Sequence, residues 1–189
     1  ATGKPEQLLK DQALRKAALN GNLGRARALL DEGANPDYRD AKGRTPLFFA
    51  ADQRNGEVVR LLLERGANPD VGPEAGIKGT ALVQAACWGC FDMVKTLVEF
   101  KADLNPYGYE WNNPLFQAIW NCNDEIATFL VEAGASTGAV NGTAKTAFQD
   151  ALTRDLHGTA LALARRGAGV ASDCGMTDIE KERLEGWPD

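Results

Sequence analysis

The chain has 189 residues, of which 44% are apolar and 25% are charged, as in an ordinary soluble globular protein. Its formal net charge of −5 disfavours non-specific binding to nucleic acid or to an anionic membrane, because both require clustered positive charge. No apolar run approaches the roughly 20 residues that a membrane span requires. We therefore expect neither nucleic acid nor a membrane among its partners.

One pattern recurs five times along the chain, at intervals of 33, 35, 33 and 33 residues. Each copy has a leucine or phenylalanine, an alanine three positions later, and a glycine or lysine 19 positions after the first residue. In chain order these slots hold Leu14, Leu47, Leu82, Leu115 and Phe148; Ala17, Ala50, Ala85, Ala118 and Ala151; and Gly33, Gly66, Lys101, Gly134 and Gly167. Five copies that agree at three slots predict a repeat architecture.

The first copy predicts a pair of helices over residues 6–30, with Gly21 at the turn between them. Terminal repeats need a polar outer surface, because nothing stacks on them. The first helix is polar enough to face water, and it carries Lys10, Asp11, Arg15 and Lys16.

The second copy shows the plan of one repeat most clearly. Residues 40–44 are turn formers, Thr45 can cap a helix, and Pro46 suits the first helical position. A second helix should bury the apolar residues of 58–63 and end at Gly66, which accepts the left-handed conformation that other residues resist.

The segment 43–51, GRTPLFFAA, resembles the signature of the ankyrin repeat family, and 58–68, VVRLLLERGAN, is similar to the family's second helix and exit. The resemblance covers about residues 6–170. It implies an all-α solenoid of about five helix-turn-helix repeats in a single domain, 1–189. The expected repeats are 6–37, 38–70, 71–105, 106–138 and 139–170, followed by a C-terminal capping helix within 171–189, where 177–180 fits a capping box.

The later copies depart from the family pattern. Residues 71–79 form a lengthened loop, Lys101 replaces the terminating glycine, and Cys122 and Asp155 occupy the glycine slot between helices. A side chain in a left-handed turn costs roughly 1 kcal/mol, so these positions should be locally destabilising without changing the fold.

The four cysteines, Cys87, Cys90, Cys122 and Cys174, are too few for a disulfide scaffold and favour a reducing, cytoplasmic setting. The visible N-terminus shows no signal peptide, so a secreted or periplasmic location would require that one had been removed.

The motif Cys87-Trp88-Gly89-Cys90 supports an alternative function in thiol redox chemistry or metal binding. Gly89, however, lies in the turn between helices, and neither a second such motif nor a nearby histidine completes a metal site. His157 is the only histidine and has no paired nucleophile. We therefore expect no enzyme activity, no cofactor and no bound metal.

The family resemblance implies a binding surface made of loop tips and the exposed side of each first helix. On that surface the third and fourth copies place Trp88, Tyr107, Tyr109, Trp111, Phe116 and Trp120, although Trp111 and Phe116 are also candidates for intramolecular packing. Tryptophan and tyrosine are enriched at binding hot spots. Acidic residues fringe the patch and weakly favour a basic or polar partner; they are Asp40, Asp52, Glu74 and Glu110.

We therefore expect a protein-protein interaction module that is monomeric alone and acts as an inhibitor, an immunity-type protein or an adaptor. A small-molecule groove on the same patch would need a set of polar residues that the sequence does not reveal.

Overall fold

The computed structural model describes residues 3–73, 79–106, 113–138, 140 and 146–168. Within them the chain forms ten helices and one isolated antiparallel bridge, between Val140 and Thr146. The helices are α1 (Gly3–Leu19), α2 (Leu23–Asp31), α3 (Pro46–Asp52), α4 (Gly56–Glu64), α5 (Ala81–Cys87), α6 (Phe91–Glu99), α7 (Pro114–Trp120), α8 (Asp124–Ala133), α9 (Ala147–Thr153) and α10 (His157–Arg165). The predicted all-α fold is confirmed.

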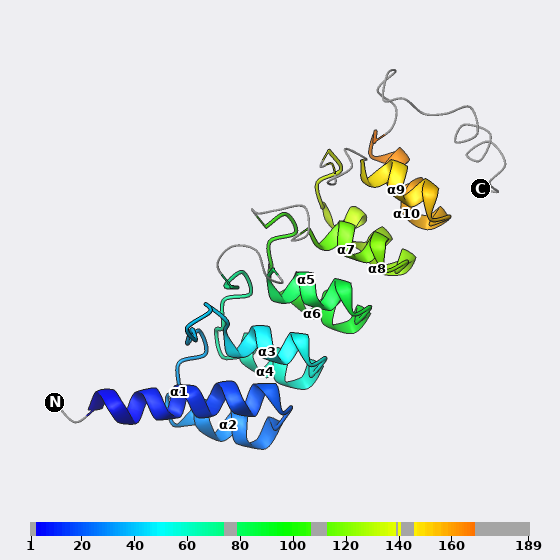
Figure 1. The fold of residues 1–189 in the computed structure, drawn as a ribbon. Coiled ribbons are helices and arrows are strands. Elements are labelled where there is room, and N and C mark those ends of the chain that lie inside the picture. The colour runs from blue at the N-terminus through cyan, green and yellow to red at the C-terminus, as the bar shows by residue number, and fades with distance from the viewer. Residues whose placement is uncertain (1–2, 74–78, 107–112, 139, 141–145, 169–189) are drawn as a thin grey trace.

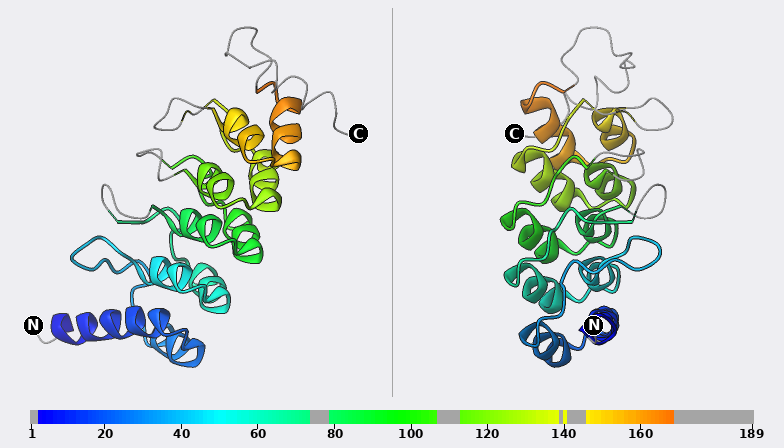
Figure 2. Two further views of the ribbon diagram at one scale, coloured as in Figure 1. Left: turned by 45° about the vertical axis from the view of Figure 1, so that its right-hand side comes forward. Right: turned by 90° about the vertical axis from the view of Figure 1, so that its left-hand side faces the viewer.

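The helices form five antiparallel pairs that stack in chain order (Figure 1). The odd-numbered helices, here the first helices, contact one another along one layer, and the even-numbered second helices form the other layer. Long loops connect the pairs, and their described parts lie beside the first helices (Figure 2). We call the side of these loops the loop edge, and the opposite side, formed by the short turns 20–22, 53–55, 88–90, 121–123 and 154–156, the turn edge.

The core follows the repeat slots. The leucine or phenylalanine of each copy is at most 2% exposed and the alanine at most 5%. Full burial of one such large side chain stabilises the fold by about 1.5–3 kcal/mol. The alanines leave room for neighbouring first helices to approach, so the same two slots supply both the core and the stacking distance.

Capping residues fix where the first helices begin. The Thr45 hydroxyl accepts a hydrogen bond from the Phe48 N–H at 3.1 Å, and Pro46 occupies the first helical turn. Asn113 caps α7 in the same way, and Thr146 forms a full capping box with Gln149 at α9. The helix start predicted at Thr45 is confirmed.

The left-handed turns were only partly predicted. Lys101, Cys122 and Asp155 adopt positive φ of 63°, 56° and 57°, as expected from the slots they occupy. Arg54 also does so, at 60°, although the sequence analysis did not single it out. It fills the slot that Gly21 and Gly89 fill in the first and third copies.

The first helix departs from the prediction. It has 17 residues where the other first helices have seven, and it projects past the stack on the loop edge (Figure 1). Asp11, expected to face water, is only 7% exposed. Its Oδ1 accepts hydrogen bonds from Gln7 Nε2 at 2.9 Å and from the Asn35 N–H at 2.7 Å. The carboxylate therefore joins α1 to the first long loop, while Lys16 is exposed as predicted.

The predicted C-terminal cap, 171–189, lies outside the described residues, and the proposed domain and repeat boundaries stay predictions. None of the helices described is long and apolar enough to cross a membrane.

Candidate functional site

Trp88 is the most exposed aromatic side chain in the described part of the chain. It follows α5 at the turn edge, and 45% of its surface is accessible. A seven-residue helix spans about 10 Å, which separates Trp88 from the loop edge. Its exposure agrees with the sequence analysis, and its role in binding stays a prediction.

Trp120, the last residue of α7, is more enclosed than Trp88. Its Nε1–H donates to Asp150 Oδ2 at 3.1 Å, and its ring centroid lies 5.7 Å from that of Phe116. Asp150 is itself only 6% exposed. One part of the indole is therefore committed to the next repeat, and only its remaining surface can meet a partner.

Phe116 is a correction to the predicted patch. It is 1% exposed and belongs to the hydrophobic core, so its ring cannot contact a partner. Phe48 and Val83, which occupy the same position in the second and third copies, are 3% and 2% exposed. The position one residue after the leucine slot is thus buried in the second to fourth copies, whereas the first and fifth copies have the half-buried Arg15 and Gln149 there.

The remaining members of the predicted patch are less informative. Tyr107, Tyr109 and Trp111 lie outside the described residues and stay predictions. Asp52 is half-buried at the end of α3, and its Oδ2 accepts a hydrogen bond from Gln53 Nε2 at 3.2 Å. Of the predicted patch, the structure therefore describes Trp88 and Trp120 as partly accessible aromatic residues.

Arg54 adds a residue that the sequence analysis missed. Its guanidinium carbon lies 5.2 Å from the centroid of the Trp88 ring, which is the geometry of a cation–π contact. The two residues are in equivalent turns of successive repeats. Placing the five turns in register would have revealed Arg54, since its slot is otherwise glycine in the first and third copies.

A second arginine lies further along the turn edge. Arg154 caps α9 and donates from Nη1 to the Trp120 carbonyl oxygen at 3.2 Å. Between the two arginines, the Asn121 amide donates to the Gln117 carbonyl oxygen at 2.8 Å. Exposed guanidinium groups thus stand on both sides of the two tryptophans.

The predicted acidic fringe is not available at Asp40. Its carboxylate binds the Arg44 guanidinium at 2.7 Å and lies 3.8 Å from that of Arg15. Burial alone would raise the pKa of Asp40, but hydrogen bonds from Arg44 and from the Lys42 N–H outweigh it and hold the pKa below its ordinary value. The guanidinium groups of Arg44 and Arg15 also lie over the ring of Phe49, at 4.6 and 5.4 Å, so the Asp40 carboxylate is engaged by a cluster within the chain.

The two thiols of the cysteine motif are not joined in a disulfide. Cys87, Cys90 and Cys122 are free, and no group of histidine, cysteine or acidic residues in the described chain is arranged to hold a metal. Burial raises the pKa of the Cys90 thiol, and the nearby charge of Arg54 offsets this only in part. A raised pKa reduces the thiolate fraction, which disfavours the redox hypothesis at Cys90.

Polar side chains at the loop edge are used to join the repeats. The Asp37 carboxylate accepts from the Asn68 N–H at 2.9 Å, Asp70 from the Asp103 N–H at 2.7 Å, and the Asn105 amide oxygen from the Ser136 N–H at 2.6 Å. Each acceptor lies 31 or 33 residues before its donor. We call this series the loop-edge ladder; its role is structural.

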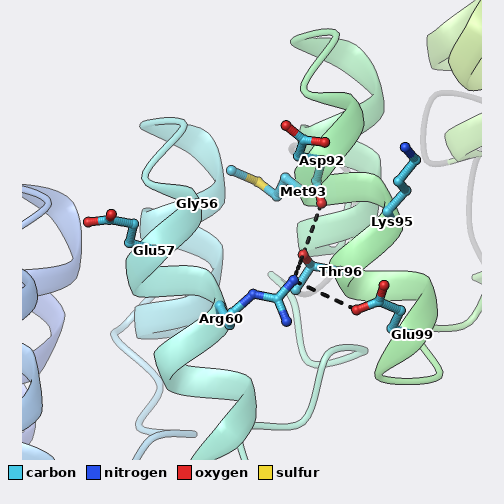
Figure 3. A pocket seen from close by; sticks show the side chains of 8 residues that line it. All are labelled: Gly56, Glu57, Arg60, Asp92, Met93, Lys95, Thr96 and Glu99. Atoms are coloured by element: carbon cyan, nitrogen blue, oxygen red, sulfur yellow. Dashed lines mark hydrogen bonds and ion pairs between the residues drawn. The ribbon is translucent and has the colours of Figure 1, made fainter.

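A groove of about 480 Å³ lies on the opposite layer, between α4 and α6 (Figure 3). Its most central cation is Arg60, which donates to Thr96 Oγ1 at 2.8 Å and lies 3.7 Å from Glu99 Oε2. The groove is lined mainly by charged side chains, and its central cation is already bound to the groove's own wall. It therefore offers less to a partner than the turn edge does.

Comparisons with known proteins agree with this architecture. A family model described as ankyrin repeats in three copies matches residues 3–73 and 71–141. An ankyrin repeat protein of fowlpox virus (strain NVSL) is 36% identical over 119 residues, which is 63% of this chain and 27% of the relative. The chain thus spans about a quarter of the length of that relative in the region of similarity.

Proposed function

This chain belongs to the ankyrin repeat family, and on that basis we propose that it binds a partner protein through the layer of first helices and its two edges. Ankyrin repeats are generally protein-protein interaction modules and are generally non-catalytic. Within that general role, we assign the centre of the binding surface to Trp88 and the surroundings of Trp120.

The exposure of Trp88 is the observation that carries this proposal. A tryptophan at 45% exposure leaves a large apolar surface in water, although the fold offers many buried positions. Tryptophan is the residue type most enriched at binding hot spots, and its burial against a partner would recover that surface. The groove between α4 and α6 lacks any comparable aromatic residue among those that line it.

Such a module would act by occlusion or by scaffolding. A rigid stack that covers a functional surface of its partner is an inhibitor or an immunity-type protein, and one that holds two proteins together is an adaptor. Both modes require the same first step, which is stable binding of the partner to the layer of first helices and its edges. The experiment below tests that step.

The test uses Trp88→Ala in the full chain as bait for the native partner in extract from its own source. We expect Trp88→Ala to recover at least tenfold less partner than the wild type, because losing a hot-spot residue costs about 2 kcal/mol or more. Trp120 is not substituted, since its indole holds Asp150.

Leu161→Ala provides the matched control. Leu161 is 36% exposed and lies on α10 in the second-helix layer, so its truncation removes exposed apolar surface away from the proposed site. Recovery should equal that of the wild type, and the circular dichroism spectra of all three proteins should coincide. Equal partner recovery by wild type and Trp88→Ala would overturn the assignment.

A further inference from the structure

The Arg54 guanidinium is held in place but its charge is not neutralised within the described chain. It lies over the Trp88 ring, and no ion pair or hydrogen bond to a described residue engages its N–H groups. Other arginines differ: Arg44, Arg60 and Arg65 each contact a carboxylate of the chain, at 2.7, 3.7 and 2.7 Å. Arg54 therefore retains donors that its counterparts have used.

Stacking also orients these donors. A guanidinium that lies over an indole keeps its planar fork of N–H groups directed to the side, where it can bind both oxygens of one carboxylate. The left-handed turn at Arg54 and the capping position of Trp88 fix the two side chains to rigid helix ends. Little conformational freedom would be lost when a carboxylate binds there.

Beside the Arg54 guanidinium, the Trp88 ring supplies an apolar surface. Trp88 is 45% exposed even with Arg54 over its ring, so an apolar side chain of a partner can pack beside the cation. The nearest sequence-predicted acid, Asp52, already accepts a hydrogen bond from Gln53. Arg154 adds a further exposed positive charge on the same edge, three repeats beyond Arg54.

We propose that Arg54 and Trp88 form a subsite for an aspartate or glutamate side chain that is followed or preceded by an apolar residue in an internal segment of the partner protein. The carboxylate would bind the Arg54 fork while the apolar residue packs on Trp88. This inference rests on the proposed function. It reverses the partner charge suggested by the sequence, because Asp40 is neutralised by Arg44 and Arg15 whereas Arg54 is not.

The test begins with a display library of random 12-residue peptides that carry no free C-terminus. Selections are run in parallel on the wild-type chain and on Trp88→Ala, and the peptides that require Trp88 are sequenced. We expect these peptides to be enriched in aspartate or glutamate next to an apolar residue. Enrichment in lysine or arginine, or no enrichment in acids, overturns the subsite.

The best peptide is then synthesised with blocked ends, together with a version in which its acid is changed to the amide. We expect the amide version to bind the wild type about tenfold or more weakly, since hydrogen bonds between charged groups are the strong class. Arg54→Gln should weaken the acidic peptide by a similar factor, and Arg54→Lys should also weaken it because lysine lacks the planar fork.

The effects of the acid-to-amide change in the peptide and of Arg54→Gln in the chain must also be non-additive. On Arg54→Gln, the acidic and amide peptides should bind equally, whereas additive losses would show that the acid binds elsewhere. Arg25→Gln is the matched control, since Arg25 is an exposed arginine of α2 outside the proposed surface, and it should change nothing. Trp88-dependent peptides without acids would remove the subsite but leave the proposed function. A selection without any Trp88-dependent peptide would count against both.

Discussion

The loop edge and the turn edge join neighbouring repeats in different ways. At the loop edge, one side-chain oxygen accepts a backbone N–H of the following repeat at each junction of the ladder. At the turn edge, Asn55 and Asn123 donate to the carbonyl oxygens of Ala18 and Ala86 in the preceding repeats. In the third copy this slot holds Cys90, whose thiol donates to the Trp88 carbonyl oxygen of its own turn.

The two edges also differ in how regular they are from one repeat to the next. The uniform edge keeps the repeats in register and uses its polar atoms for that purpose. The varied edge lacks the asparagine at the third copy, which has Cys90, and at the fifth, which has Leu156, and the exposed Arg54–Trp88 pair lies at the first of these two junctions. The proposed subsite therefore lies at one of the junctions that depart from the repeat pattern.

The largest expected effect concerns the strongest link beside the turn edge. The Asp124 carboxylate accepts from the N–H groups of Gly158 and Thr159, at 3.0 and 2.8 Å, and from the Thr159 hydroxyl at 2.6 Å. Asp124→Ala should destabilise the fold by about 3 kcal/mol, because these donors at the start of α10 lose a charged acceptor. Urea unfolding measures this change.

Glu125→Ala serves as the control for Asp124→Ala. Glu125 is the next residue of α8 and is exposed, so its loss should change stability by less than about 0.5 kcal/mol. If the two variants unfold at the same urea concentration, Asp124 does not stabilise the last repeat. The hydrogen bonds beside the turn edge would then contribute little to the stability of the stack.

The next effect tests whether the loop edge is uniform. Asp37→Ala and Asp70→Ala should each cost about 1 kcal/mol, because each removes one hydrogen bond of the ladder. At the turn edge, Asn123→Ala should cost a similar amount and Cys90→Ala clearly less, as read from the same unfolding curves. The contrast between a uniform loop edge and a varied turn edge would fail in either of two cases. In one, Asp37→Ala and Asp70→Ala lower the unfolding free energy by different amounts; in the other, Cys90→Ala lowers it as much as Asn123→Ala does.

A smaller effect, of opposite sign, is expected at the left-handed turns. Arg54→Gly and Cys122→Gly should stabilise the fold by about 0.5–1 kcal/mol each, since glycine adopts positive φ without steric cost. The reverse change, Gly89→Ala, should destabilise it, and its new Cβ would lie 3.0 Å from Asn123 Oδ1. Thermal unfolding midpoints give the sign, and a lower midpoint for Arg54→Gly would show that stacking on Trp88 outweighs the strain.

The smallest effect is the pH dependence contributed by Asp40. Because its folded pKa lies below the unfolded one, its stabilising contribution is complete above about pH 4 and is lost as the pH falls through the folded pKa. Asp40→Asn should therefore flatten the fall in stability on acidification, while stability at pH 7 decreases. Unfolding curves from pH 7 to pH 2 measure both effects. If the free energy of unfolding falls as steeply below about pH 4 in Asp40→Asn as in the wild type, Asp40 does not titrate in this way.

The sequence predicted what local chemistry and the repeat determine. The leucine and alanine slots are buried as expected, because each copy repeats the same packing. Contacts across long separations were missed. Asp11 was expected to be exposed because its Asn35 partner lies 24 residues away, and Arg54 was overlooked because its stacking depends on a ring 34 residues later. Phe116 was misplaced because its position is buried in the second to fourth copies but holds the half-buried Arg15 and Gln149 in the first and fifth, so the repeat alone does not show its burial.

The long first helix has a consequence for protein engineering. Through Asp11 it supplies the acceptor that Asp37 supplies to the following loop, and Gln7 binds the Gly33 carbonyl oxygen beside it. One side chain of α1 therefore does for the first long loop what a loop side chain does for the next. Transplanted ahead of another array whose first loop presents the same N–H, this helix should supply the missing acceptor, and the gain in unfolding free energy would measure how much one such contact contributes.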